Sequence, residues 1–154
     1  AVSISGVSGG AGGTFTVAGY DIYGYPMTQL VTVAAGANTV NTLKTFKAIA
    51  SVTPNFADAH NYSVGTADIF GFGLLASFFG DVLINWNSAL VSANNGFVAA
   101  DTTSPATTAT GDVRGTYATQ SASDGTKRLI MKVAPTLGAL VTNPTTGLFG
   151  QPQV

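Results

Sequence analysis

The sequence predicts an all-β fold: an antiparallel β-sandwich, jelly-roll or immunoglobulin-like, with extended terminal arms. Three observations lead to this prediction. Thr, Val, Ile, Phe and Tyr, which suit the pleated surface of a sheet, are abundant, whereas Glu is absent and Lys, Arg and Gln are scarce. Short runs of alternating apolar and polar residues are separated by Gly, Asn, Asp or Pro. Finally, the segment 135–154 contains three prolines and three glycines and few runs of strand length.

The expected strands follow one another along the chain, and each is an alternating run bounded by turn residues. They span residues 2–7, 14–17, 27–33, 39–52, 61–64, 81–92, 97–100, 113–119 and 128–133. Residues 35–38 and 94–96 contain Gly and Asn, which tolerate positive φ, and are expected to form tight hairpin turns. Residues 43–50 are compatible with a short helix, but the alternation of Phe46, Ala48 and Ala50 favours a strand.

The organisation expected from these runs is one β-sandwich domain over residues 1–134 and an extended C-terminal arm over residues 135–154. Residues 102–110 read either as a surface loop or as a further arm, and residues 1–13 could also reach a neighbour. The C-terminal arm carries apolar side chains that need burial somewhere, which makes them interface candidates: Leu137, Leu140, Leu148 and Phe149.

The low charge restricts the partners of the protein. Six Lys and Arg residues, dispersed along the chain, cannot form the basic stripe that binds a phosphate backbone, so no nucleic acid is expected. The apolar stretch 69–86 is interrupted by three glycines and Asp81, and is interpreted as buried strands rather than a membrane span. A free monomer would carry too little charge to keep it soluble. The low charge therefore favours a homo-oligomer in a symmetric assembly.

Two glycine-containing motifs invite a catalytic or cofactor interpretation. Ser8 lies in a Gly-x-Ser-x-Gly pattern, but no helix pattern follows it, and the single possible base, His60, lies in an expected loop. Gly71, Gly73 and Ala76 resemble a dinucleotide fingerprint, yet no acidic residue stands at the distance needed for the ribose. We therefore expect no catalytic residue and no cofactor.

The acidic residues are too dispersed to predict a metal or acid–base site. Asp58, His60 and Asp68 come nearest to a metal cluster, and a solvated loop explains them more simply. Asp58 with Asp68, and Asp101 with Asp112, are the nearest carboxylate pairs, and all four residues fall in expected loops. The sequence thus favours a protein that is not an enzyme and holds no metal.

Two blocks of the chain contain short motifs rich in turn residues. The first, residues 19–73, contains an Asp-x-x-Gly-x-Pro turn, a Lys-x-Phe-Lys-x-Ile run and a Ser-Val-Gly-Thr-x-Asp-x-Phe-Gly run. The second, residues 111–117, reads Gly-Asp-Val-Arg-Gly-Thr-Tyr and is followed by Asp124-Gly125 and by Lys127, Arg128 and Leu129. Together these two blocks resemble small structural proteins of tailed-bacteriophage virions. Gln29 departs from the pattern of those proteins, in which an acid is expected at this position.

This resemblance implies a non-enzymatic virion protein, a capsid decoration or cement protein on the outer capsid surface. Its implied partners are the major capsid protein and copies of itself, with no membrane contact. Tyr20, Tyr23 and Tyr25, around one expected turn, are the aromatic anchors we expect at such an interface. The alternative is a tail-associated or adhesive β-domain that binds carbohydrate through these tyrosines and Trp86. Capsid, neck and tail positions all remain open at this point.

Overall fold

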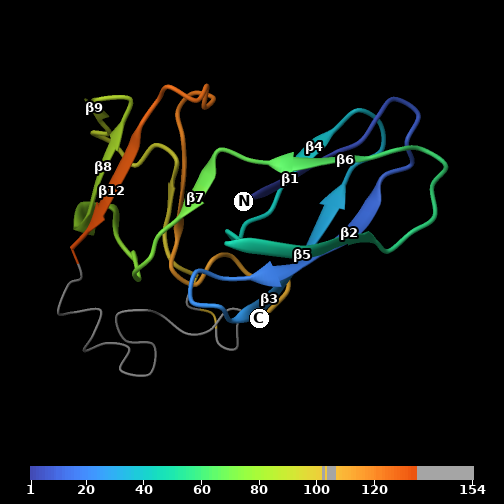
Figure 1. Ribbon diagram of the computed structural model, residues 1–154, viewed down its shortest axis with the longest axis horizontal. Coiled ribbons are helices and arrows are strands. Elements are labelled where there is room, and N and C mark those ends of the chain that lie inside the picture. The colour runs from blue at the N-terminus through green and yellow to red at the C-terminus, as the bar shows by residue number, and fades with distance from the viewer. Residues whose placement is uncertain (102, 104–106, 135–154) are drawn as a thin grey trace.

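The computed structural model describes residues 1–101, 103 and 107–134, and almost all of its regular structure is β (Figure 1). Four antiparallel three-stranded sheets are formed, with strand orders β4-β1-β6, β3-β2-β5, β10-β11-β7 and β12-β8-β9. The strands are β1 (Val2–Ser5), β2 (Gly13–Tyr20), β3 (Pro26–Val33), β4 (Thr39–Asn41), β5 (Ala48–Pro54), β6 (Ser63–Thr66), β7 (Ile69–Gly71), β8 (Val82–Trp86), β9 (Ala89–Leu90), β10 (Phe97–Val98), β11 (Thr116–Ala118) and β12 (Leu129–Val133). A single 3₁₀ turn, η1 (Phe79–Asp81), precedes β8.

The all-β class and the antiparallel pairing are therefore confirmed, whereas the sandwich type stays a prediction. The described residues include no helix that is long and apolar enough to cross a membrane. Residues 135–154, with Leu137, Leu140, Leu148 and Phe149, lie outside the described residues, and so does the predicted C-terminal arm. The N-terminal residues do not form an arm, because β1 is the central strand of its sheet and the Ala1 ammonium donates to the Ile69 carbonyl.

Strands β2 and β3 form the most regular hairpin, and their alternation is what the sequence predicted. Phe15 and Val17 of β2 and Val31 of β3 point into the core, while threonines such as Thr14 and Thr32 face outward and bond to each other across the strands. β-Branched and aromatic side chains on such a pleated surface favour a strand over a helix. The pairing register runs from Gly13 opposite Val33 to Tyr20 opposite Pro26.

The predicted single strand over residues 39–52 is wrong, because the chain leaves one sheet and enters another within it. β4 pairs with β1, whereas β5 pairs with β2. Between them Thr42 and Lys44 turn inward: the Thr42 hydroxyl accepts from the Val2 amide and donates to the Lys44 carbonyl, and the Lys44 amide donates to the Gln29 side chain. These contacts satisfy backbone groups that strand pairing no longer serves. Consequently, residues 35–38 link two sheets instead of closing a hairpin.

The predicted strand over residues 81–92 is also two strands, β8 and β9, joined by a tight hairpin. Asn87 and Ser88 occupy its two central positions with φ of 51° and 67°. Positive φ at both positions is the geometry that matches the twist of paired strands. Residues 94–96 therefore do not close a hairpin either, because β10 pairs with β11 and not with β9.

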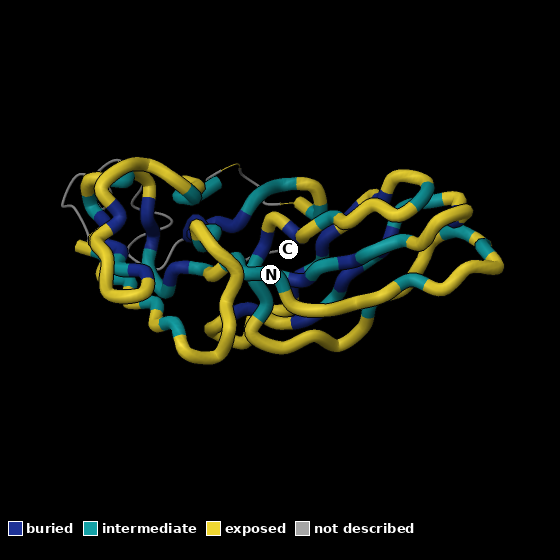
Figure 2. Tube along the Cα trace, turned by 90° about the horizontal axis from the view of Figure 1, so that it is seen from above, coloured by how far each residue is buried: buried dark blue, intermediate teal, exposed yellow. Residues whose placement is uncertain are grey.

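Two hydrophobic clusters, one in each half of the elongated molecule, hold these sheets together (Figure 2). We call residues 1–66 the N-terminal half and residues 67–134 the C-terminal half. The first cluster joins β1 to β2 and β3 through Val2, Ile4, Phe15, Val17, Val31 and Val33. The second joins β8 to β11 and the segments around them through Phe72, Ala76, Val82, Ile84, Trp86, Val91 and Tyr117.

Tyr117 in the second cluster provides a prediction about stability. Its side chain is fully buried, and its hydroxyl has no hydrogen-bond partner among the described residues. A buried, unsatisfied hydroxyl costs about 1–3 kcal/mol. Tyr117→Phe removes the hydroxyl and keeps the ring. Thermal unfolding of this variant should therefore show a free energy of unfolding that is higher by about 1 kcal/mol. A loss of stability instead would mean that the hydroxyl is satisfied in the folded protein.

Candidate interaction site

The turn between β2 and β3 is organised by one buried carboxylate, that of Asp21. Its Oδ1 atom accepts hydrogen bonds from the amides of Tyr23 at 2.8 Å and Tyr25 at 2.9 Å. The Asp21 backbone closes the turn by donating to the Tyr25 carbonyl and accepting from the Gly24 amide. Gly24 has a φ of 84°, a conformation that strains residues with a Cβ. This geometry accounts for Asp21 and Gly24 of the Asp-x-x-Gly-x-Pro turn in the first sequence block.

An arginine from the other half of the molecule locks this turn in place. The Arg114 Nη2 atom lies 2.6 Å from Asp21 Oδ2, and the two side chains are 4% and 0% exposed. The Arg114 guanidinium also stacks on the Tyr23 ring, 5.0 Å from its centroid, and the Tyr23 hydroxyl donates to the Gly73 carbonyl. An arginine that is both paired and stacked holds its partners in one geometry.

Two further charged side chains complete this junction between the halves. The Asp112 carboxylate accepts from the Arg114 amide through Oδ1 and from the amide and hydroxyl of Thr45 through Oδ2. The Lys44 ammonium donates to the carbonyls of Thr28 and Thr107, and burial lowers the pKa of Lys44. Residues of the two sequence blocks, 19–73 and 111–117, therefore meet here, and we call Asp21, Lys44, Asp112 and Arg114 the junction. Because Thr107 and Thr108 bond to the same chain, the described part of 102–110 is a packed loop, not an arm.

On the outside of this turn lies a group of large apolar side chains, which we call the tyrosine patch: Tyr20, Ile22, Tyr23 and Tyr25. Tyr20 is 47% exposed and Tyr25 is 49% exposed, although their backbone is rigidly held. Tyr23, also predicted as an anchor, is exposed on one face and engaged with Arg114 on the other. The sequence thus identified three members, and it missed Ile22, whose position between Asp21 and Tyr23 in the turn was the available signal.

A hollow of about 300 Å³ lies beside the tyrosine patch. Its lining combines both halves: Ile22, Thr45, Phe46, Lys47, Gly71, Phe72 and Arg114. A concave surface next to exposed aromatic side chains is a common feature of interaction sites. The patch and the hollow together form the candidate site.

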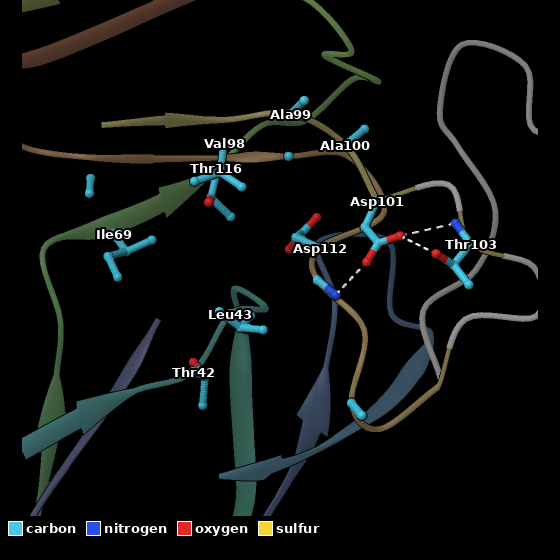
Figure 3. Close-up of a pocket in the computed structure, with 14 residues that line it drawn as sticks. Thr42, Leu43, Ile69, Val98, Ala99, Ala100, Asp101, Thr103, Asp112 and Thr116 are labelled. Carbon is cyan, nitrogen blue, oxygen red and sulfur yellow. Dashed lines mark hydrogen bonds between the residues drawn. The ribbon is translucent and has the colours of Figure 1, made fainter. Parts of the chain in front are cut away.

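A larger cavity of about 840 Å³ lies between the halves, with Leu43, Ile69 and Val98 among its apolar lining (Figure 3). Asp101 and Asp112 stand at its wall. Both carboxylates are engaged in holding loops: Asp101 accepts from Thr103 and from the Gly111 amide, and Asp112 accepts from Thr45. Hydrogen bonds from Thr103 and Gly111 lower the pKa of Asp101, so it remains an acceptor. Of the two carboxylate pairs considered from the sequence, Asp101 and Asp112 both line this cavity.

Neither the protein-family models, nor the curated proteins, nor the solved structures contain a match to the chain.

The remaining sequence candidates lie apart from the tyrosine patch. Asp58 Oδ1 lies 2.7 Å from His60 Nδ1, but Asp68 bonds to Ser123 instead, so the three do not form a cluster. Ser8 is exposed in the loop after β1, where no helix follows it. Gly71 ends β7, and no α-helix follows it in the described part of the chain, unlike in a dinucleotide-binding turn.

Asp58 predicts a specific response of stability to acid. Its Oδ2 atom accepts from the Tyr62 hydroxyl at 2.6 Å and from the Ala11 amide at 2.8 Å, which ties two loops together. Hydrogen bonds from Tyr62 and then His60 hold the pKa of Asp58 well below its usual range. Because folding lowers the pKa of Asp58, the stability that this carboxylate contributes is fully present above its pKa in the unfolded chain. That contribution is lost as the pH falls from there through the pKa of the folded protein.

We therefore expect Asp58→Asn to be less stable than the unsubstituted protein at pH 7 and to lose less of its stability on acidification. Thermal unfolding across a pH series from about 7 to about 2.5 measures both effects. Equal losses in the two proteins on acidification would contradict this assignment.

Proposed function

We propose that the chain is a non-enzymatic structural subunit of a tailed-phage virion, a decoration or cement protein on the outer surface of the capsid. Its partners in this proposal are the major capsid protein and copies of itself. The observation that carries the proposal is the tyrosine patch: half-exposed aromatic side chains on a turn that a buried ion pair holds rigid. The two sequence blocks that contribute this turn and Arg114 resemble proteins of tailed-phage virions. This resemblance supplies the virion context of the proposal.

The physical argument begins with the cost of ordering an interface. Fixing flexible side chains and loops on binding costs free energy, and a preorganised turn avoids most of that cost. Tyrosine contributes a large contact area with few rotatable bonds, which is why it is enriched among the residues that dominate binding energy. A chain with only 8% charged residues also has little charge to desolvate. These properties suit a subunit that only needs to adhere.

A stable interface buries about 1,200–2,000 Å² in total, more than one turn supplies. In the proposal the segment 135–154 makes the remaining contact with neighbouring subunits through Leu137, Leu140, Leu148 and Phe149. Repetition on a symmetric lattice then multiplies individually weak contacts. The same arrangement would also serve at the neck or tail, and copy number separates these positions.

The test is binding of the purified protein to virions that lack it. The double variant Tyr20→Ala/Tyr25→Ala should bind at least about thirtyfold more weakly, since the loss of even one aromatic anchor costs about 2 kcal/mol or more. Val64→Ala is the matched control, because Val64 is equally exposed but lies on β6, outside the tyrosine patch. Unchanged thermal unfolding would show that both variants fold. Binding of the double variant at the unsubstituted level would refute the tyrosine patch as the interface.

The second candidate function is a tail-associated or adhesive domain that binds carbohydrate, which the exposed rings of Tyr20 and Tyr25 favour. Trp86, also considered from the sequence, does not fit, because it is buried in the second cluster and its Nε1 donates to the Ser121 hydroxyl. Binding of the isolated protein to a glycan array, lost in the same double variant, would support this function over the first.

A further inference from the structure

The sheet formed by β12, β8 and β9 presents a second surface at the end of the molecule where these strands lie (Figure 1). Alternation divides its residues between two faces. Val82, Ile84 and Trp86 of β8 point into the second hydrophobic cluster. Leu83 and Asn85 therefore point outward, as do the residues opposite them on β12.

The outward face is apolar at its centre. Lys132 stands opposite Leu83, Ile130 stands opposite Asn85, and Leu90 of β9 stands opposite Asn85 on the other side. Leu83, Leu90 and Ile130 are 49%, 61% and 41% exposed. Three large aliphatic side chains gathered on one open sheet face are a feature of protein-binding surfaces.

A hollow of about 390 Å³ on this face adds charge to its apolar centre. It is lined by Leu83, Asn85, Ser88, Arg128, Ile130 and Lys132. Two of these six residues are cations, and none is an acid. Among the described residues neither Arg128 nor Lys132 forms an ion pair. We call these six residues together with Leu90 the basic apolar face.

The positions of the two cations indicate what kind of partner would fit. Arg128 and Lys132 are four residues apart with Ile130 between them, a separation of about 13 Å along an extended chain. A partner that places apolar side chains against Leu83 and Ile130, with carboxylates on either side, would neutralise both cations. Unpaired cations at an apolar contact are costly to desolvate, so a partner without acids fits this face poorly.

A second copy of the chain does not supply these carboxylates well. The segment 135–154 contains no acidic residue. Of the seven aspartates, six accept hydrogen bonds within their own chain: Asp21, Asp58, Asp68, Asp101, Asp112 and Asp124. The charge on this face therefore favours a different protein.

We propose that the basic apolar face is a docking site for a partner protein other than this chain, one that presents apolar side chains flanked by Asp or Glu. The inference rests on the proposed function, in which that partner is another virion protein. It adds to that function a second contact, at the opposite side of the C-terminal half from the junction, with a defined charge requirement.

The test uses virions that lack the chain and measures binding of two double variants. Arg128→Glu/Lys132→Glu reverses both charges at exposed positions and should weaken binding about tenfold or more. The matched control, Arg128→Lys/Lys132→Arg, keeps both charges and should bind as the unsubstituted protein does. Binding of the control, but not of the reversed variant, should weaken as salt screens the carboxylates. Equal binding of the two variants would overturn the inference.

Zero-length carbodiimide coupling in assembled particles identifies the contact directly. Lys132 should couple to an Asp or Glu of another virion protein. Coupling of Lys132 only to a second copy of the chain, or no coupling at all, would overturn the inference. These results are separate from the proposed function itself. If the chain binds virions through the tyrosine patch and the charge reversal leaves binding unchanged, only this inference is refuted. If the unsubstituted chain does not bind, both are refuted.

Discussion

Asp21→Ala is expected to lower the free energy of unfolding by about 3–5 kcal/mol, a large fraction of the stability of a small domain. The substitution leaves the Arg114 guanidinium buried without its counter-charge, since both side chains are almost completely enclosed. It also removes the acceptor of the Tyr23 and Tyr25 amides, so the turn loses its organising contact. Urea-induced unfolding followed by circular dichroism measures the loss.

Asp124 provides the matched control for that experiment. It caps a turn in the same manner, accepting from the Thr126 amide, and it pairs with Lys127 at 3.4 Å, but its side chain is half exposed. Asp124→Ala should therefore lower the free energy of unfolding much less than Asp21→Ala does. The double variant Asp21→Ala/Arg114→Met, in which both buried charges are gone, should be more stable than Asp21→Ala alone. Equal losses at Asp21 and Asp124 would show that the buried pair does not hold the turn.

Ile84→Ala is expected to destabilise the protein by about 2–5 kcal/mol. Ile84 is fully buried at the centre of β8, and it contributes to the cluster that holds the C-terminal half together. Its truncation loses apolar burial and leaves a cavity that a packed sheet closes only in part. Denaturant unfolding of the variant gives the difference in free energy.

The adjacent residue supplies the comparison. Leu83→Ala removes a side chain of the same size from the same strand, but this side chain is half exposed on the opposite face. Its loss should cost less than about 1 kcal/mol. A similar cost at both positions would contradict the assignment of the two faces of β8, on which the basic apolar face also depends.

Alternation in the sequence predicted the strands whose two faces have clearly different surroundings. Strands β3 and β12 were expected close to their observed bounds, because their apolar residues recur at every second position. The run expected over residues 14–17 covers only half of β2, which continues to Tyr20. The break between β4 and β5 could not be predicted in the same way. Residues 39–52 are compatible with one strand throughout, and the break arises from tertiary burial of Lys44, which the sequence presents as an ordinary surface cation.

The candidate site was predictable in part for a similar reason. Tyr20, Tyr23 and Tyr25 could be identified because aromatic residues around a turn have few ways to be buried. The ion pair that holds the turn could not be predicted, since Arg114 lies 93 residues from Asp21 and only the fold brings them together. The basic apolar face was also missed: Arg128 and Lys132 looked dispersed along the chain until β12 placed them on one side of a sheet.

The central proposal, that the chain is a structural component of a phage virion, is tested most directly by quantitative mass spectrometry of purified phage particles. The capsid proposal predicts hundreds of copies per particle, in a fixed ratio to the major capsid protein. A number near six or twelve would instead place the subunit at the neck or tail. Absence of the chain from washed particles would contradict the claim.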